Sequence, residues 1–280
     1  MKHFRFWSFI RHRRCFYAGI IFSGSGLDHD AAQALRPFPS AFYGSRCRGC
    51  VWLSALLSRP QKSPGLSRLL FLCGLVLAVC EGFKQGFLYF VENNHTYDWW
   101  YFPFQLCSVP MYLGLLLPAA NSVPRLRSVF TVFIQDYGLL GGIMALLEPS
   151  GLMHPYWLMT IHGFLWHFIL IFMGLSCAFQ TESGKDMRSF LRTIPLFLFC
   201  AALATAVNLL SHPYGDADMF YLSPYYPNSQ VVFHQIALTL GVGTGNILYL
   251  LSMILGGGIC HLISKKLYYF QKHHSKASLF

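Results

Sequence analysis

Cys107 is the residue best placed to do covalent chemistry, because it lies between two prolines in the otherwise apolar stretch Trp99–Gly114. A cysteine becomes a nucleophile when a nearby base removes its proton, and that base is commonly a histidine brought close by folding. His162 and His167 lie in a later apolar segment, at a depth similar to that expected for Cys107. The sequence therefore presents a candidate thiol–imidazole pair.

The stretch around the thiol is expected to form one helix over Trp99–Ala120. Pro110 has no N–H, so in such a helix the carbonyl of Leu106 would lose its partner beside the thiol. A free carbonyl in hydrocarbon is tolerated only where protein or water satisfies it. We therefore predict that Cys107 faces inward, towards protein or a wet cavity.

Two histidines compete for the role of base. His162 and His167 are five residues apart, so about 140° separates them on a helix and only one can face Cys107 squarely. The stripe that carries His167 is small and polar, whereas that of His162 includes Trp166 and is expected to face lipid. Periodicity therefore favours His167, although a buried cysteine is more often inert packing than a nucleophile.

Further polar groups fall inside apolar segments, where ionisable side chains are costly and mark candidate sites. Glu81 and Lys84 are three residues apart on one helix face and are expected to neutralise each other, either bracing the bundle or lining a site. Asp136 precedes several glycines, so it is either a hydrogen-bond partner between helices or a site residue. With Cys107, the two histidines and His234, most of these groups lie in the half of the segments expected to be outward.

The composition identifies a membrane protein. Of 280 residues, 54% are hydrophobic, 17% aromatic and only 11% charged, which is too few charges to cover a soluble globule of this length. The net charge of +10 does not indicate nucleic-acid binding, because the basic residues cluster at the termini and in short loops.

The chain divides into a basic arm at 1–65 without regular periodicity, a transmembrane region at 66–263 and a basic tail at 264–280. Cys47 and Cys50 form a lone CxxC in the arm, which indicates a surface loop more than a zinc site. The expected fold is all-α, a polytopic bundle of six transmembrane helices. Each segment is near the roughly 20 residues that span a bilayer: Leu66–Val91, Trp99–Ala120, Ser128–Leu147, Tyr156–Phe179, Phe190–Leu210 and Phe233–Ile263.

The charges of the connections predict the orientation. The connections after the first, third and fifth segments contain no Lys or Arg, whereas the arm, the tail and the other connections are basic. By the positive-inside rule both termini are cytoplasmic, in a multi-pass protein of the cell membrane. The last segment is long enough to include an interfacial piece before its crossing, because glycines interrupt it.

Several motifs together resemble the YwaF family of bacterial integral membrane proteins. They are Glu81-Gly-Phe-Lys84-Gln85, Phe102-Pro-Phe-Gln-Leu-Cys107-Ser-Val-Pro-Met-Tyr112, the pair His162-Gly163, and Met219-Phe-Tyr-Leu-Ser-Pro224. A related eukaryotic transmembrane enzyme transfers fatty acyl groups between phospholipids with a cysteine and a histidine. The resemblance implies Cys107 as nucleophile and His162 as base. Many members carry histidine where this chain has Gln105, which cannot take a proton but could donate to an oxyanion.

Two functions are thus expected to compete. The first is a phospholipid acyltransferase with Cys107, His162 and His167 as catalytic candidates. The second is a small-solute transporter or receptor with an outward polar vestibule. The candidate substrate-binding residues are Glu81, Lys84, Gln105, Asp136 and His234. The expected partners are membrane lipids, no cofactor is implied, and the oligomeric state is open. A metal site from His95, His154, His162 and Glu148 lacks a ligand-spacing motif.

Overall fold

The structure is a computed structural model that describes residues 63–181 and 186–277, with side chains over 65–181 and 186–272. The arm up to residue 62, with Cys47 and Cys50, lies outside the described residues. The described part consists of helices and loops, in the order α4 Ser63–Phe87, π-helical η1 Leu88–Glu92, η2 Trp99–Tyr101, η3 Leu106–Ser108, α5 Val109–Ala120, α6 Pro124–Leu147, η4 Pro149–Leu152, α7 Trp157–Gln180, α8 Met187–Leu191, α9 Ile194–Ser211, η5 Met219–Tyr221, α10 Val231–Leu240 and α11 Val242–Ala277.

Five helical runs in the described residues are long and apolar enough to cross a membrane. They are Gly65–Glu92, Pro124–Leu147, Trp157–Gln180, Met187–Ser211 and Val242–Lys272. The all-α prediction is confirmed for the described residues, and these runs coincide with five of the six predicted segments. The exception is the second segment, whose helical part covers Leu106–Ala120 only. The number of crossings therefore depends on how this shorter element sits in the bilayer.

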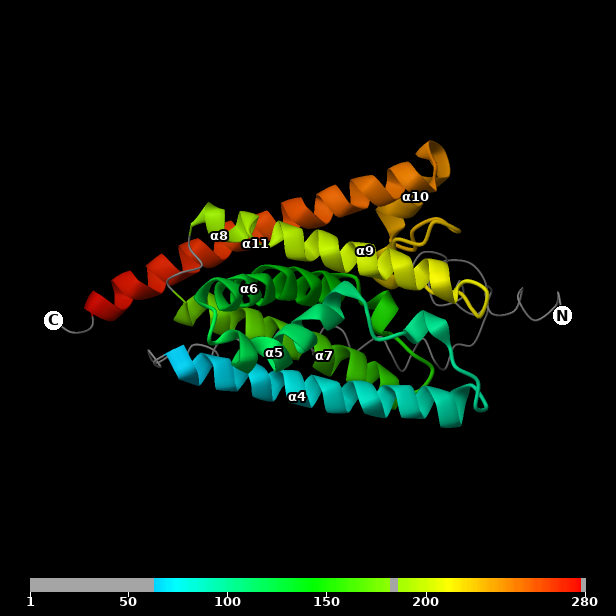
Figure 1. The fold of residues 1–280 in the computed structure, drawn as a ribbon, viewed down its shortest axis with the longest axis horizontal. Helices are drawn as coiled ribbons and strands as arrows, with labels where there is room; N and C mark the ends of the chain where they lie inside the picture. Colours follow the sequence, from blue (N-terminus) through cyan, green and yellow to red (C-terminus); the bar gives the residue numbers. More distant parts are fainter. Residues whose placement is uncertain (1–62, 182–185, 278–280) are drawn as a thin grey trace, which may run out of the picture.

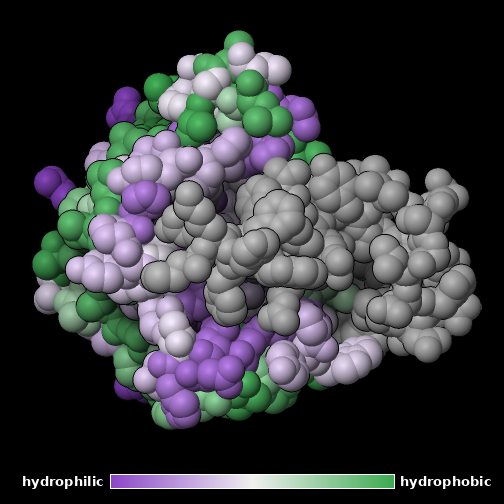
Figure 2. Space-filling view, turned by 90° about the vertical axis from the view of Figure 1, so that its right-hand side faces the viewer, coloured by the Kyte–Doolittle hydropathy of each residue, from purple (hydrophilic) through white to green (hydrophobic). Residues whose placement is uncertain are grey.

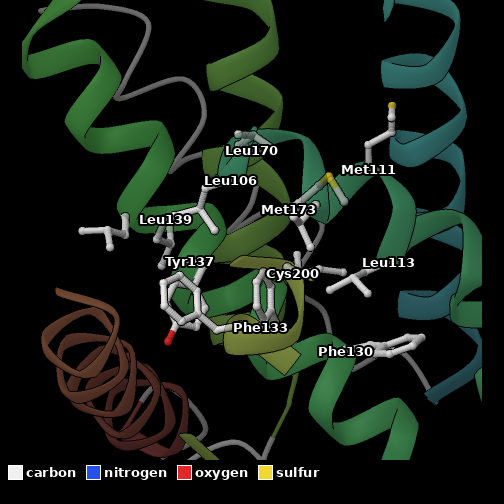
Figure 3. Close-up of a cluster of buried hydrophobic side chains, with 14 of the residues drawn as sticks. Leu106, Met111, Leu113, Phe130, Phe133, Tyr137, Leu139, Leu170, Met173 and Cys200 are labelled. Carbon is white, nitrogen blue, oxygen red and sulfur yellow. The ribbon is translucent and has the colours of Figure 1, made fainter. Parts of the chain in front are cut away.

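The core is built around α6. Every residue from Phe130 to Leu140 is buried, so this helix is covered on all sides. Figure 3 shows apolar side chains from η3 and α5, α6, α7 and α9 meeting in this core. Tyr137 stacks on Phe197 of α9 with ring centroids 4.9 Å apart, and its hydroxyl points towards α11. Glycines allow close contact with α7, because a Cβ at Gly142 would lie 3.1 Å from the His167 carbonyl oxygen.

Successive connections lie at opposite ends of the bundle (Figure 1). The end that carries the connections 88–105, 148–156 and 212–230 is called the acidic end, because these connections contain acidic residues and no Lys or Arg. The end that carries residues 121–123 and the C-terminus of α11 is called the basic end. This alternation matches the predicted one, while the side of the membrane that each end faces stays a prediction. Figure 2 views the acidic end, where hydrophilic side chains collect near the end of α4 and apolar side chains form much of the rim.

The predicted interfacial piece corresponds to α10, which ends at Gly241. Gly241 has φ +88°, a left-handed conformation that turns the chain from α10 into α11. α10 packs mainly on α11, and its outer apolar side chains are exposed. α11 continues to Ala277, well beyond the predicted end at Ile263.

Candidate functional site

The segment that carries the thiol is called the cysteine stretch, residues 101–108. It is not helical throughout, because Phe102 and Gln105 have extended backbone ψ angles of 133° and 164°. The prediction of one helix over Trp99–Ala120 is therefore wrong. Pro103 starts the disruption, since the residue before a proline is restricted to extended conformations.

The expectation for Pro110 is also wrong. The proline lies in the first turn of α5, where a missing N–H leaves no bond unmade. The Leu106 carbonyl oxygen accepts from the N–H of Val109, so it keeps a partner. The thiol thus follows an extended segment and precedes a helix start.

Side chains from three helices satisfy the carbonyl oxygens of the cysteine stretch. Gln85 Nε2 of α4 donates to the Tyr101 oxygen (2.6 Å), the Tyr112 hydroxyl of α5 to that of Pro103 (2.6 Å), and Trp166 Nε1 of α7 to that of Cys107 (3.1 Å). Non-helical backbone at membrane depth is tolerated only when protein covers it in this way. These bonds fix the main chain at Cys107, a residue of intermediate burial.

Trp166 contacts both the main chain of Cys107 and the ring of His162. The Trp166 ring lies 5.7 Å from the His162 ring, centroid to centroid, while its Nε1 bonds to Cys107. Trp166 is only 5% exposed, so the expectation that this stripe faces lipid is wrong for Trp166. The His162 ring hydrogen-bonds to the backbone of Cys80 on α4, and its buried Nε2 has no hydrogen-bond partner. A ring held by one nitrogen leaves the other nitrogen available as a base.

His167 is held differently. Its Nδ1 lies 2.7 Å from the Gly163 carbonyl oxygen one turn earlier in α7, and its side chain is buried. This bond requires a proton on Nδ1, which leaves Nε2 as the acceptor. A Cβ at Gly141 would lie 3.9 Å from Cys107 Cβ, and one at Gly142 3.1 Å from the His167 oxygen. Cys107 and His167 therefore both lie close to Gly141 and Gly142 of α6.

Glu81 and Lys84 form the predicted ion pair, with Lys84 Nζ 2.8 Å from Glu81 Oε1. Gln85 Nε2 donates to the same oxygen at 2.8 Å. Both charges interact electrostatically with the Cys107 thiol and the His162 ring. Their mutual neutralisation is confirmed, and they lie close to the candidate thiol and base.

Gln105 binds a tight turn of the acidic end, residues 218–222, which is called the η5 turn. Its Nε2 donates to the Asp218 carbonyl oxygen, and its Oε1 accepts from the Phe220 N–H, both at 2.8 Å. Asn208 of α9 makes the equivalent pair of bonds to Met219, at 3.1 Å and 2.6 Å. The Gln105 amide is thus committed to holding the η5 turn.

The η5 turn is strained. Phe220 and Tyr221 both have positive φ, at 58° and 56°, a conformation that costs non-glycine residues about 1–3 kcal/mol each. The Asp218 carboxyl is 1% exposed; its Oδ1 accepts from the Ser223 N–H, and its Oδ2 has no hydrogen-bond partner. Burial raises the pKa of Asp218 from 3.8 to about 7, and the Ser223 bond opposes this shift. The turn therefore needs its amide clamps to hold it.

The other two candidates do not join the thiol in the contacts observed. Asp136 Oδ2 lies 2.9 Å from His261 Nδ1 of α11, and both side chains are 0% exposed. Asp136 is thus the interhelical partner that was one of its two predicted roles. His234 Nδ1 lies 3.0 Å from the Asn228 carbonyl oxygen in the loop before α10.

Within the described residues, no group of three or more His, Cys, Asp and Glu side chains is placed to hold a metal ion. His154, one of the residues considered for such a site, pairs instead with Glu92 at 3.2 Å. This pair joins the end of η1 to the segment before α7, at the acidic end.

Three residues hold the site or its surroundings through tertiary contacts that the sequence pattern does not indicate. The pattern predicts a lipid-facing stripe for Trp166, and it names no partner for His261 or Asn208. The usable signal was their type, since histidine and asparagine in apolar segments need hydrogen-bond partners.

The fold and this site define a class, a polytopic helical membrane protein with a thiol and two histidines among its helices. Within that class, the chain belongs to the TMEM164 family, whose model matches residues 44–263. The match begins upstream of Leu66, where the resemblance seen in the sequence began. No curated protein and no solved structure gives a significant match to the chain.

Proposed function

We propose that this protein is a Cys/His acyltransferase that acts on phospholipids in the cell membrane. The observation that carries the proposal is the arrangement of Cys107, Trp166 and His162. The main chain of Cys107 is fixed by Trp166 Nε1, and the imidazole beside that indole has an unpartnered Nε2. Such an imidazole is suited to accept the proton of a thiol.

The proposed reaction has two steps. The histidine takes the Cys107 proton, the thiolate attacks the ester carbonyl of a phospholipid, and the C–O bond breaks as the leaving lyso-lipid oxygen takes that proton. An acceptor hydroxyl then gives its proton to the histidine and attacks the thioester, and the C–S bond breaks to restore the thiolate. His162 is our first choice of base because its Nε2 has no hydrogen-bond partner, and His167 is the second.

The resemblance of the motifs to the YwaF family, and to a eukaryotic Cys/His phospholipid acyltransferase, supports the same assignment. Gln105 replaces the histidine that many members carry. We assign Gln105 to holding the η5 turn, because both ends of its amide bind that turn. Glu81 and Lys84 are proposed to line the site, since both act electrostatically on the thiol and on His162.

The transporter or receptor alternative is less well supported. It needs Asp136 and His234 to line one vestibule with Glu81 and His162. Asp136 is instead fully buried against His261, and His234 bonds to a loop carbonyl.

The proposal is tested with the full-length protein reconstituted in lipid nanodiscs with a labelled phospholipid and an unlabelled lyso-lipid acceptor. We expect label in the acceptor, loss of transfer in Cys107→Ser, and a large loss in His162→Gln or His167→Gln. Cys73→Ser is the matched control, because Cys73 is another partly exposed cysteine of α4 and, unlike Cys80, does not hold the His162 ring; its change is expected to leave transfer intact. Absence of transfer by the wild type, or equal transfer by Cys107→Ser, would refute the proposal.

A further inference from the structure

The last turns of α11 carry a continuous basic and aromatic face at the basic end. Leu262, Lys265, Lys266, Tyr269 and Lys272 are spaced by three or four residues, so they share one side of the helix. All five are exposed, whereas His261 and Ser264 of the same turns are 0% exposed. We call the five residues the basic stripe.

The basic stripe lies beyond the part of α11 that a bilayer requires. α11 has 36 residues, about 54 Å at 1.5 Å per residue, whereas about 20 residues cross the hydrocarbon. Figure 1 shows the C-terminal end of α11 extending past the neighbouring helices. The stripe is therefore at the level where lipid headgroups are found.

Charge near the stripe is strongly one-sided. α11 contains no Asp or Glu, and no carboxylate pairs with Lys265 or Lys266 within the described residues. Exposed Arg188 and Arg192 extend from α8 and its C-cap, and Phe190 of α8 packs on α11, with its ring 5.8 Å from that of His261. Among the described residues, the basic end has one exposed carboxylate, Asp186, and Asp136 is buried further inside.

The stripe also has a shape that suits a headgroup. A groove of about 460 Å³ is lined by Leu262, Lys265, Lys266 and Tyr269. Its lining is mostly carbon, and two of the four residues that line it are lysines. Lys272 Nζ lies 5.7 Å above the Tyr268 ring, which adds a further cation next to the groove.

We propose that the basic stripe of α11 is a binding site for the phosphate-bearing headgroup of an anionic phospholipid in the leaflet at the basic end. The phosphate lies between Lys265 and Lys266, and the first part of the acyl chains lies on Leu262 and Tyr269. Basic residues next to a membrane helix attract anionic lipid by about 1 kcal/mol each. This site is separate from Cys107 and does not depend on the proposed acyl transfer.

The test is binding of dioleoylphosphatidylserine to the full-length protein in neutral detergent micelles, counted by native mass spectrometry. Lys265→Gln with Lys266→Gln is expected to weaken binding about 30-fold, or about 2 kcal/mol, and Lys266→Gln alone about fivefold. Arg125→Gln with Arg127→Gln is the matched control, because it removes two charges at the same end from α6, and a change below threefold is expected. Dioleoylphosphatidylcholine is expected to bind at least tenfold more weakly than the serine lipid.

Two arms separate this site from its alternatives. Glycerophosphoserine, the headgroup without acyl chains, is expected to compete poorly, and equal competition would show a site for soluble phosphate compounds and overturn the lipid assignment. Equal loss of binding in the α6 control would show only a general attraction of anionic lipid to positive charge. Equal binding of the choline lipid would show only adhesion of acyl chains. Either result would also overturn the proposed headgroup site. Lys265→Arg with Lys266→Arg should restore binding, since it keeps both charges.

Discussion

Gln105→Ala tests how the cysteine stretch and the η5 turn hold each other. The substitution removes two hydrogen bonds, one donated to the Asp218 carbonyl oxygen and one accepted from the Phe220 N–H, each 2.8 Å long. Phe220 has a left-handed backbone with φ 58°, a conformation that is strained for any residue other than glycine. Without the clamp, the strain in the η5 turn is expected to open it.

The expected magnitude follows from the two bonds. Each contributes about 1 kcal/mol net, so opening of the η5 turn becomes easier by about 2 kcal/mol. This corresponds to about a 30-fold larger open population. The strain at Phe220 and Tyr221 is present in both proteins, so it makes the turn easier to open but does not add to this difference.

Amide hydrogen exchange provides a measurement with an internal control. The Phe220 N–H is held by Gln105, whereas the adjacent Met219 N–H is held by Asn208 Oδ1 at 2.6 Å. Gln105→Ala should speed exchange at Phe220 about 30-fold and change Met219 much less. Asn208→Ala should reverse this order.

Two results would refute the reasoning. If Phe220 exchanges less than threefold faster in Gln105→Ala, the bonds do not hold the turn. If Met219 and Phe220 accelerate equally in both variants, the turn opens as a unit and the separate clamps are not supported.

Three further predictions concern stability. Asp218 has its pKa raised by burial from 3.8 to about 7, so the folded state holds more protons between these values and the free energy of unfolding should fall as pH rises from about 4 to about 7. Asp218→Asn should flatten that slope in denaturant unfolding, and an unchanged slope would exclude Asp218 as its source. His261→Ala should destabilise the protein by about 3 kcal/mol because it leaves buried Asp136 without its ring partner. Changing both Asp136 and His261 to leucine should cost less, because no buried charge is then left unpaired. A double-mutant cycle on the free energy of unfolding measures the difference. Gly241→Ala should destabilise by about 1 kcal/mol because its φ is +88°, while Gly243→Ala, in helix with open space at Cβ, should stabilise slightly. Equal thermal midpoints for the two variants would contradict the left-handed turn at Gly241.

Local patterns were sufficient for the long helices. α6 and α7 begin within a few residues of the predicted segments, because about 20 apolar residues in a row can satisfy their backbone in lipid only as a helix. The Glu81–Lys84 pair was likewise predictable, since residues three apart on a helix face each other.

The cysteine stretch was not predictable in the same way. Its apolar residues satisfy the hydropathy criterion, yet its backbone leaves the helix and takes its hydrogen bonds from Gln85, Tyr112 and Trp166. These donors come from three different helices, so a one-dimensional pattern contains no record of them. The same holds for Gln105, whose partners lie more than 100 residues later.

What the sequence determined about this protein is its solvent: a chain with so few charges, and with cations confined to alternate connections, must place its helices in a bilayer. What the tertiary structure decided is which polar groups meet. Asp136 lies against His261, Gln105 binds the η5 turn, and Trp166 contacts both Cys107 and His162. The physical reason is that a polar group in an apolar interior must find a partner, and distance along the chain does not determine which one is near.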